Sequence, residues 1–373
     1  MYFAPVAILV SSLLCAVPLK VHARSISTRA TVCNGYSEVC DPLIIKYSLR
    51  SQGNVTFVGA HDSYAVSSGS VAANQDYNVT TQLNEGIRML QIQAHNSSGV
   101  IHLCHTSCVI LDAGTLSNYL SSVKTWLDGN PNEVVVILIV NSDNLPPSQY
   151  ATVYQSVGLD SLSYSPTTAT IDGSQWPTLG TLIDSGKRVL TFMDSNADFA
   201  SVPYIIDEFS NIWETAYDVT DQTFNCAVNR TGTAGNKMYL INHYLDKTET
   251  LFGLTFPVPD KSLLNVTNAV SGYGSLGLQA SQCGAEYSKY PTVILVDFYN
   301  YGGGSVFQVA ANLNSVTYVP HSVSPAVTST ATSSGSNPTG SPQSNDAPLS
   351  VSGNPLNLGV LFGAVLCGAM LVL

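Results

Sequence analysis

The sequence predicts an α/β fold, and the architecture that fits it best is a (β/α)8 TIM-type barrel, irregular or distorted in places. Short apolar runs, several of them rich in β-branched residues, alternate with stretches of helical spacing, which is typical of βα units around a parallel sheet. The region between the two apolar chain ends also has a length that such barrels commonly fill. Fewer than eight strand-like runs stand out, so closure of the barrel is inferred.

Six apolar runs are the strand candidates, at residues 55–59, 89–93, 134–140, 189–193, 237–241 and 293–296. Between the second and third runs, apolar residues recur at helical spacing from Leu116 to Leu127. Thr115 is suited to cap the start of that helix, and Asn130, followed by proline, to end it. A last helix is expected around residues 308–313.

The first residues of the chain indicate a secretory signal peptide. Residues 4–17 form an apolar run of the length of a signal-peptide core, and residues 21–23 include the small residues of a cleavage site. We therefore expect residues 1–23 to be removed and the folded domain to cover residues 24–322.

The last residues indicate a glycosylphosphatidylinositol (GPI) anchor. An almost wholly apolar tail, 356–373, follows a polar spacer, 348–355, and small residues around Asn345, which is the pattern of an anchor-attachment signal. We expect the lipid on Asn345 and removal of 346–373 as a propeptide. A membrane-spanning tail is the alternative, but such tails normally carry flanking positive charge, and none follows this one. Residues 323–345, rich in Ser, Thr and Pro, are expected to form a disordered stalk.

Cysteines and glycosylation sequons agree with this secretory route. Of eight cysteines, six lie outside the two end segments, and six in a secreted chain predict three disulfides in any of fifteen connectivities. Local spacing favours Cys33–Cys40 and Cys104–Cys108, leaving Cys226–Cys283, whereas the spacing suits zinc poorly. N-glycans are expected at five sequons: Asn54, Asn78, Asn96, Asn229 and Asn265. We expect a secreted glycoprotein at the cell surface, GPI-anchored to the plasma membrane or cell wall.

The charge balance excludes two classes of partner. Only 10% of the residues are charged, and the formal net charge is −11. Nucleic-acid binding needs clustered Lys and Arg, and electrostatic capture by anionic lipid needs the same. We therefore expect neither.

Two histidines are the best candidates for catalysis. His61 and His105 each stand where an apolar run gives way to small or polar residues, the place where a barrel strand delivers a side chain to a catalytic mouth. Two imidazoles facing one pocket can supply a base and an acid near neutral pH. Simpler explanations exist: His61 precedes the turn-forming Asp62, and His105 lies in a loop between two cysteines. Asp297 follows four apolar residues, where a lone carboxylate is costly unless paired.

Five stretches resemble the catalytic X-type domain of phosphatidylinositol-specific phospholipase C, particularly the bacterial enzymes and fungal secreted relatives. They occur in the family's order: Gly59-Ala-His-Asp-Ser63, Gly86-Ile-Arg-Met-Leu-Gln-Ile-Gln93, His102-Leu-Cys-His105, the run from Thr115 to Leu138 with Asn130-Pro-Asn-Glu-Val134, and Val293-Ile-Leu-Val-Asp-Phe-Tyr299. The resemblance implies a phospholipase C-like phosphodiesterase barrel, a phosphoric diester hydrolase acting in lipid metabolism.

The resemblance also implies roles for four residues. His61 matches the general base that takes a proton from the inositol 2-hydroxyl, which then attacks phosphorus. His105 matches the general acid that protonates the leaving glycerol oxygen. Asp297 matches the carboxylate that orients the base, and Asp62 the one that supports the acid. We expect this chemistry to need no metal and no cofactor.

The chain departs from the family pattern at Gln91 and Gln93. Bacterial relatives carry an Asp and an Arg there, and that Arg stabilises charge on phosphorus; metal-dependent animal relatives carry acidic calcium ligands. Neutral amides offer no formal charge, although electrostatic stabilisation is usually the largest catalytic effect. Arg88 points to the opposite face of its strand and does not replace the charge. An Arg or Lys entering from a distant loop would restore the case for catalysis.

Further residues are expected to contact the substrate: Gln91, Gln93, Asp194, Trp213, Glu214, His243 and Tyr299. Trp213 is equally well explained as an ordinary half-buried aromatic residue, and His243 as a residue without a role.

The predicted function is that of an extracellular phosphodiesterase of the phospholipase C type, acting on phosphatidylinositol or a glycan-inositol lipid. The alternative, which the two glutamines favour, is a weakly active or inactive barrel that binds inositol-glycan or cell-wall carbohydrate. A glycosidase with Asp194 and Glu214 as its carboxylates is a third possibility that no motif supports. We expect a monomer.

Overall fold

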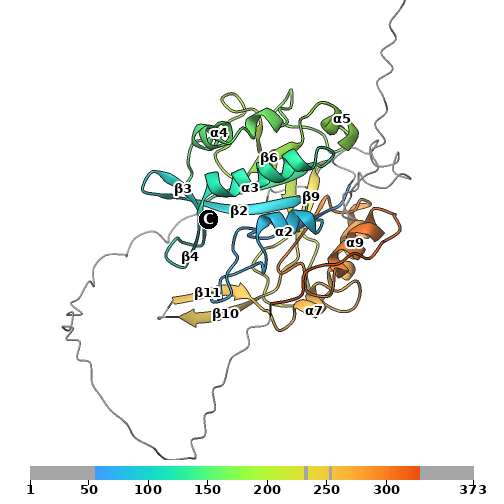
Figure 1. Ribbon diagram of the computed structural model, residues 1–373. Coiled ribbons are helices and arrows are strands. Elements are labelled where there is room, and N and C mark those ends of the chain that lie inside the picture. The colour runs from blue at the N-terminus through green and yellow to red at the C-terminus, as the bar shows by residue number, and fades with distance from the viewer. Residues whose placement is uncertain (1–54, 231–233, 252–253, 328–373) are drawn as a thin grey trace, which may run out of the picture. The chain divides into compact units, whose positions relative to one another are not determined.

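The computed structural model describes residues 55–230, 234–251 and 254–327 of the 373-residue chain. Eight parallel strands within these ranges form a curled sheet with helices on its outer side (Figure 1). Around the sheet the strand order is β7-β6-β5-β2-β1-β12-β9-β8. The bounds of these strands are β1 Phe57–Ala60, β2 Met89–Ser97, β5 Val135–Asn141, β6 Val189–Met193, β7 Ile205–Asp207, β8 Ile212–Glu214, β9 Met238–Asn242 and β12 Val293–Val296.

The barrel has a seam between β7 and β8. These two strands end the hydrogen-bonded path, and within the described residues they do not pair with each other. The four-residue helix α6 (Glu208–Asn211) connects them along the chain. Every other neighbouring pair on the path is parallel, as in βα barrels. The prediction of an irregular (β/α)8 barrel is confirmed.

Two antiparallel additions lie outside the parallel path. β3 (Val100–His105) pairs with the far end of β2, and β4 (Leu111–Thr115) pairs with β3. β10 (Asp246–Leu251) and β11 (Leu254–Pro259) form a separate hairpin, visible beside the barrel in Figure 1.

Strand alternation separates two cores. Phe57, Met89 and Leu295 belong to one cluster, and their chain neighbours Val58, Leu90 and Val296 belong to the other. The first cluster fills the barrel and the second lies between strands and helices, because successive side chains point to opposite faces of a strand. Gly59 faces the interior: a Cβ there would come within 2.9 Å of Leu295 Cδ1, so the packing at that point requires glycine.

The helices of the domain surround the sheet, and the predicted ones are confirmed. Thr115 caps α3 by accepting a hydrogen bond from the backbone N–H of Asn118, and the expected last helix is α9. The bounds are α2 Val79–Asn84, α3 Leu116–Gly129, α4 Pro147–Ser156, α5 Leu179–Asp184, α7 Leu264–Thr267, α8 Leu276–Tyr287 and α9 Ser305–Leu313, with a 3-10 turn at Asp160–Leu162.

Two of the predicted disulfides and four of the predicted glycosylation sites lie within the described residues. Cys104–Cys108 and Cys226–Cys283 are both formed, which confirms two of the three predicted disulfides. The four described sequon asparagines are exposed: Asn78, Asn96, Asn229 and Asn265. Cys33–Cys40, Asn54, the signal peptide, Asn345 and the propeptide lie outside the described residues. No helix within the described ranges is long and apolar enough to cross a membrane.

Contacts with the domain continue past the boundary predicted at residue 322. Ser324 donates hydrogen bonds from its N–H and hydroxyl to Glu85, and the N–H of Val327 donates to Asp76 at 2.9 Å. Val323 packs against the outer core. The first five residues of the predicted stalk, 323–327, therefore contact the barrel domain.

Candidate active site

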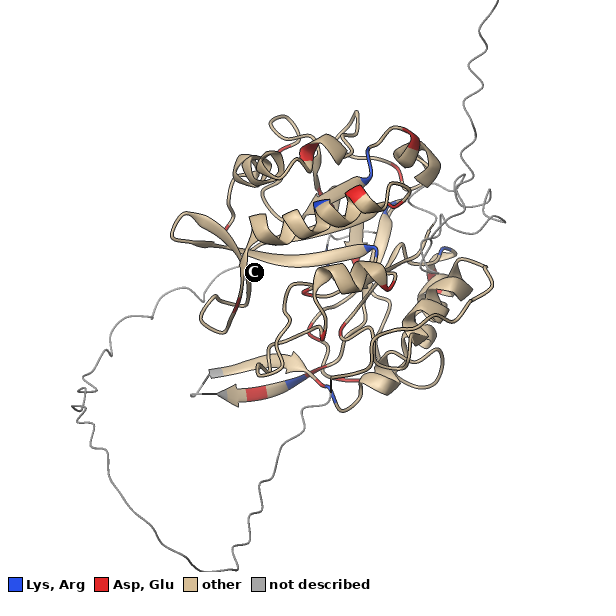
Figure 2. Cartoon of the chain, viewed as in Figure 1, with Lys and Arg blue, Asp and Glu red and all other residues tan. Residues whose placement is uncertain are grey.

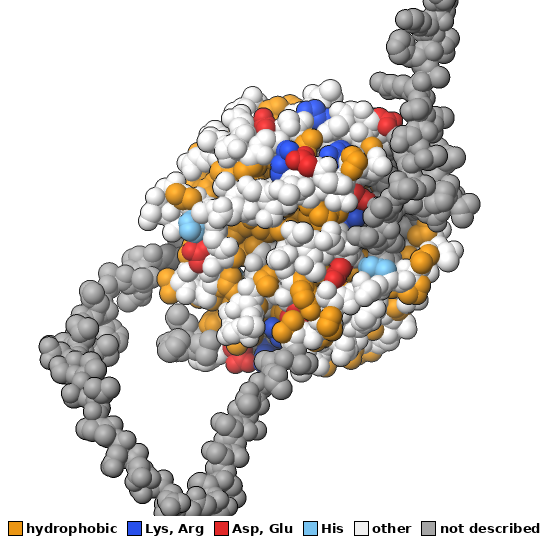
Figure 3. All heavy atoms as spheres, viewed as in Figure 1, with side chains coloured by type: hydrophobic (Ala, Val, Ile, Leu, Met, Phe, Trp, Pro, Cys, Tyr) orange, Lys and Arg blue, Asp and Glu red, His pale blue; other side chains and the backbone are white. Residues whose placement is uncertain are grey.

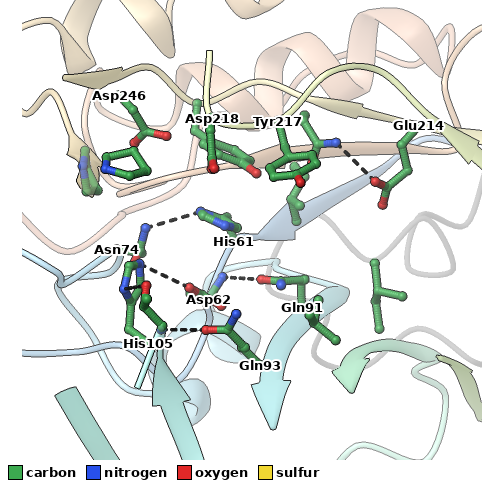
Figure 4. A pocket seen from close by; sticks show the side chains of 18 of the residues that line it. His61, Asp62, Asn74, Gln91, Gln93, His105, Glu214, Tyr217, Asp218 and Asp246 are labelled. Carbon is green, nitrogen blue, oxygen red and sulfur yellow. Dashed lines mark hydrogen bonds and ion pairs between the residues drawn. The ribbon is translucent and has the colours of Figure 1, made fainter. Parts of the chain in front are cut away.

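A cavity of about 260 Å³ opens at the carboxyl ends of the barrel strands. His61 directly follows β1, Gln91 and Gln93 lie on β2, and Glu214 and Asn242 end β8 and β9. All five line the cavity, and Figure 4 shows the labelled side chains converging on it. Parallel strands place their carboxyl ends at one edge of the sheet, which is why residues far apart in the sequence meet here.

His61 is held by a carboxylate, an amide and an aromatic ring. Its Nδ1 lies 2.9 Å from Oδ1 of the buried Asp297, which follows β12. Asn74 Nδ2 donates to the two oxygens of Asp297 at 3.1 and 3.3 Å. The ring of Tyr244 stacks on the imidazole, with centroids 3.8 Å apart and planes 5° apart. Because Nδ1 is engaged by Asp297, Nε2 is the atom left to exchange a proton with a ligand.

These contacts raise the pKa of His61 to about 9. Burial on its own would lower this pKa, but the negative charge of Asp297, followed by that of Asp62, outweighs it and favours the imidazolium. The hydrogen bond to Asp297 acts in the same direction. At neutral pH the free protein therefore holds His61 protonated, and the imidazole becomes a base as the pH rises.

His105 has a carboxylate partner of its own. It ends β3, and its Nε2 lies 3.5 Å from Oδ2 of the buried Asp62. Asp62 adopts a left-handed backbone conformation, with φ at +37°, directly after the strand end that bears His61. Such backbone angles are uncommon outside glycine and cluster at functional sites. Of these two adjacent residues, His61 pairs with Asp297, whereas Asp62 pairs with His105.

Gln91 and Gln93 hold the backbone beside both histidines. Gln91 Oε1 accepts a hydrogen bond from the N–H of Asp62 at 2.6 Å, and Gln93 Oε1 accepts one from the N–H of Thr106 at 2.7 Å (Figure 4). Asp62 follows His61, and Thr106 follows His105. The glutamines line the cavity, as predicted for substrate contacts, and they also fix the position of the two loops.

Arg230 brings a positive charge into the cavity from the segment between β8 and β9. Its Nη2 lies 3.4 Å from Oδ2 of Asp194, and its Nη1 lies 3.6 Å from Oε2 of Glu214. The guanidinium carbon stands 4.6 Å from the centroid of the Phe209 ring. The side chain keeps 31% of its surface exposed, so it is accessible to a ligand. Arg230 is therefore a cation that enters the cavity from a loop distant in the sequence from β2.

Acidic side chains dominate the rest of the cavity lining: Asp62, Glu208, Glu214, Asp218 and Asp246. Burial raises the pKa of Glu208 well above its usual value, and the neighbouring Glu214 adds to the effect. Burial, followed by repulsion from Asp297, raises the pKa of Asp246 to about 8. Several of these carboxyl groups consequently hold protons more tightly than they would in water.

Among the described residues, one group of side chains has ligand atoms close enough together to hold a metal ion. It consists of Cys104, Cys108 and Asp112, whose ligand atoms lie within 4.8 Å of one another. The two sulfur atoms are bonded to each other as a disulfide, so they offer no thiolate to a metal.

Comparison with known proteins decides the family. The family model described as PI-PLC X 1 matches residues 47–314. The chain belongs to the PI-PLC X family. A "PI-PLC X domain-containing protein 1" of Arthroderma benhamiae is 42% identical over 276 residues, covering 73% of this chain and 86% of that protein. An "Uncharacterized secreted protein" of the same fungus is 47% identical over 298 residues, covering 78% of this chain but only 66% of that relative.

The fold agrees with this assignment. A mutant of phosphatidylinositol-specific phospholipase C from Staphylococcus aureus superposes with a TM-score of 0.51 at 15% identity, covering 72% of this chain and 94% of that one. At this level of identity the likeness concerns the barrel alone.

Three predicted substrate contacts in this PI-PLC X domain lie outside the cavity. Trp213 is 1% exposed and stacks on Tyr239 in the outer core, with ring centroids 4.5 Å apart. His243 is fully buried between Gln279 and the backbone carbonyl of Thr267, and burial lowers its pKa to about 4. Tyr299 is also buried and donates its hydroxyl hydrogen to Glu85. For these three residues the prediction of a substrate contact is wrong.

Asp194, another predicted substrate contact, instead contacts Arg230. It is not among the residues that line the cavity; its Oδ2 holds Arg230 and its Oδ1 accepts a hydrogen bond from the N–H of Asn141 at 2.9 Å. Glu214 does line the cavity, as predicted.

Sequence reasoning missed several residues that the PI-PLC X barrel brings to the cavity, among them Asn74, Asp218, Arg230, Tyr244 and Asp246. For two of them a signal was present. Asn242, Tyr244 and Asp246 alternate with His243 and Leu245 beyond the apolar run of β9, and the period of two places the first set on the inner face. No comparable pattern surrounds Arg230, which lies outside any strand.

Proposed function

We propose that this protein is an extracellular, metal-independent phosphodiesterase of the phospholipase C type that cleaves an inositol phosphodiester. The observation that carries the proposal is the presence of two histidines in one cavity, each with its own carboxylate: His61 with Asp297, and His105 with Asp62. Reciprocal acid and base groups are what the transfer of phosphorus to a neighbouring hydroxyl requires. Membership of the PI-PLC X family supports the same reaction class.

In the proposed reaction, Nε2 of His61 takes the proton of an inositol hydroxyl, whose oxygen forms a bond to phosphorus. The bond from phosphorus to the leaving alcohol oxygen breaks, and His105 gives that oxygen its proton. The products are a cyclic phosphodiester and a free alcohol. Asp297 stabilises the imidazolium that forms at His61, and Asp62 supports His105.

Arg230 is proposed to stabilise the charge on the phosphoryl oxygens. Gln91 and Gln93 carry no formal charge, and Arg230 is the Lys or Arg side chain that lines the cavity in the part of the chain that the structure describes. Its contacts to Asp194 and Glu214 are 3.4 and 3.6 Å long, and a guanidinium has further donors with which to bind phosphate. Preorganised positive charge of this kind is a major source of catalysis in phosphoryl transfer.

The test is release of water-soluble inositol phosphate from phosphatidylinositol by the secreted protein, with EDTA present. We expect turnover that survives EDTA and disappears in His61→Ala. His102→Ala is the matched control, because His102 lies on the same strand as His105 but pairs with Asp112 outside the cavity. Turnover that EDTA abolishes would reject the metal-free mechanism.

One observation favours a second candidate function. Five acidic side chains line the cavity beside Arg230, and those that are ionised repel an anionic phosphodiester. A barrel that binds inositol-glycan or wall carbohydrate without cleaving it would fit that charge. Equal absence of turnover in the wild type and in His61→Ala, together with measurable glycan binding, would move the assignment to this function.

We also propose that the protein is secreted and held at the cell surface by a GPI anchor on Asn345. The signal-like chain ends support this, and a 47% identical relative is named as a secreted protein. Mass spectrometry of the membrane-bound form should find its last residue at Asn345 with lipid attached. A C-terminal peptide extending into 346–373 would contradict the proposal.

A further inference from the structure

Residues 74–77 form a short loop that contacts both members of the His61–Asp297 pair. Asn74, which lies next to His61 in Figure 4, donates from Nδ2 to the two carboxylate oxygens of Asp297 at 3.1 and 3.3 Å. Gln75 Nε2 donates to the backbone carbonyl of His61 at 2.8 Å. Asn74 and Gln75 are both buried. The position of this loop therefore helps to fix the backbone of His61 and the carboxylate of Asp297.

The next two residues of the loop contact segment 323–327, which follows the barrel. Asp76 Oδ2 accepts a hydrogen bond from the N–H of Val327 at 2.9 Å. The hydroxyl of Tyr77 donates to the carbonyl of Pro325 at 2.7 Å. The segment belongs to no helix or strand, so contacts of this kind hold it against the domain. Four consecutive residues thus join the histidine pair to the segment that leads into the predicted stalk.

A second set of contacts joins the same segment to helix α2. The N–H and the hydroxyl of Ser324 donate to Oε1 of Glu85, the residue that caps the carboxyl end of α2. Gln82, within α2, donates from Nε2 at 2.7 Å to the carbonyl of Ser63, two residues after the first histidine. Gln82 and Ser63 are fully buried. Both the loop and the helix beside this histidine are therefore bonded to the segment.

We propose that segment 323–327 is a positioning segment for His61: docked on the loop and on α2, it holds the His61–Asp297 pair in its working geometry. The segment lies after residues 47–314, which the family model matches, so it adds support from outside the matched domain. The inference rests on the proposed function for its effect on turnover. Its effect on the proton of His61 needs no substrate and is measured separately.

Release of the segment is expected to lower the pKa of His61. Burial lowers this pKa, and the negative charges around the imidazole outweigh burial and raise the pKa to about 9. The titratable groups that face the ring from the elements around it are Asp62, Asp218, Tyr244, Asp246 and Asp297. Water that enters beside a loosened loop weakens burial and attraction together, so the pKa moves back toward 6.5.

The test is an NMR titration of His61 in the full secreted chain, with Ser324→Glu/Val327→Pro as the releasing variant. A glutamate at position 324 meets the carboxylate of Glu85, and a proline at 327 has no N–H to donate to Asp76. We expect the midpoint of the titration to move to lower pH, with the proton bound about tenfold less tightly. The added negative charge by itself could only raise the midpoint. The His61 resonance is the one that is missing from the spectrum of His61→Ala.

Ser324→Thr/Val327→Ala is the matched control, because it changes the same two positions but keeps both N–H groups and the hydroxyl. It should titrate as the wild type does. A midpoint that is the same in the releasing variant and in the wild type would overturn the proposal, and so would an equal shift in the control.

Turnover of phosphatidylinositol by the same proteins separates this proposal from the proposed function. We expect kcat of the releasing variant to fall roughly tenfold to a hundredfold, because the base is no longer held in position. Turnover by the wild type with an unchanged midpoint in the releasing variant refutes the positioning segment alone. A shifted midpoint in a protein that cleaves nothing refutes only the phosphodiesterase.

Discussion

At His61, two opposing effects act on one proton. Burial disfavours the imidazolium, and the carboxylate of Asp297 at 2.9 Å favours it more strongly, so the pKa reaches about 9. A general base must be free of its proton before the reaction starts. The ascending limb of the pH–rate profile, which reports the pKa of this base, is therefore expected above neutral pH.

Replacing Asp297 with Asn is expected to move the ascending limb of the kcat/KM profile to lower pH and to reduce its maximum by roughly 10²–10⁴-fold. The neutral amide no longer holds the proton on His61, and it no longer stabilises the imidazolium during turnover. The measurement is kcat/KM against pH for both proteins. Asp112→Asn is the control, because Asp112 contacts His102 and the backbone N–H of Gly114, both outside the cavity. A limb that stays in place would contradict this account of the pKa.

At this scale the sequence located both histidines and both carboxylates, but it misjudged side-chain direction. On β8, Glu214 faces the cavity and Trp213 faces the outer core; after β9, Tyr244 faces the cavity and His243 is buried outside it. Period-two alternation would have separated these pairs. The place of Arg230 in the cavity could not be predicted from the sequence, because no local pattern surrounds it. The Cys226–Cys283 disulfide and the tertiary fold bring its segment to the cavity.

At the scale of elements, the β3–β4 excursion carries the second histidine. β2 extends beyond the barrel and pairs antiparallel with β3, which returns His105 to the cavity. The disulfide Cys104–Cys108 closes the turn around that residue, and Gln93 holds the next peptide. A fixed loop limits the movement of the imidazole, which matters because catalysis depends on position to within about 1 Å.

The two disulfides are expected to act differently when each is replaced by a pair of alanines. Loss of Cys226–Cys283, with a sequence separation of 57, should lower the free energy of unfolding by about 4 kcal/mol, whereas loss of Cys104–Cys108, with a separation of 4, should cost about 2 kcal/mol. Only the second should lower kcat out of proportion to stability, because it frees the loop of His105. Denaturant unfolding and kcat measured on both variants test this. Equal stability losses with unchanged kcat would show that the short disulfide does not position His105.

The sequence revealed the longer strands and missed the shortest. The six candidates correspond to β1, β2, β5, β6, β9 and β12. β7 and β8 have three residues each, too few for an apolar run or a period to be recognised. β3 contains His102 and His105 and is partly exposed, so its pattern is not that of a buried strand.

At the scale of the whole molecule, charge is sparse and unevenly placed (Figure 2). Arg88 and Arg188 directly precede β2 and β6, at the amino ends of the strands, and bond Glu133 and nearby carbonyls. The opposite end holds the acidic cavity. Most of the visible surface is uncharged or apolar (Figure 3). The cavity lining thus gathers several acidic side chains, and protons bound there affect stability.

Asp246 and His61 each contribute stability that is lost as the pH rises. The folded pKa of Asp246, about 8, lies above its ordinary 3.8, so the folded state holds a proton that the unfolded state releases, and stability is lost between about pH 4 and 8. His61, raised from 6.5 to about 9, gives the same sign between about pH 6.5 and 9. Each effect is worth up to about 1.4 kcal/mol per pH unit.

Asp246→Asn should therefore raise the melting temperature more at pH 8 than at pH 5, because the amide has no proton to lose. Thermal unfolding at the two pH values measures this. Asp221→Asn is the control, because Asp221 is exposed and bonds only the nearby Thr223 among the described residues. A gain of equal size at both pH values would show that the proton on Asp246 does not cause the pH dependence of stability.

The seam between β7 and β8 leaves the barrel open along one side. In a closed barrel the complete ring of hydrogen bonds fixes the diameter, whereas an open barrel can widen when the sheet bends. The edges of the seam carry Glu208 and Glu214, both of which face the cavity. Within the described residues, this side of the cavity can widen without breaking any pairing between strands, and we expect the size of the ligand that it admits to depend on how far the sheet bends.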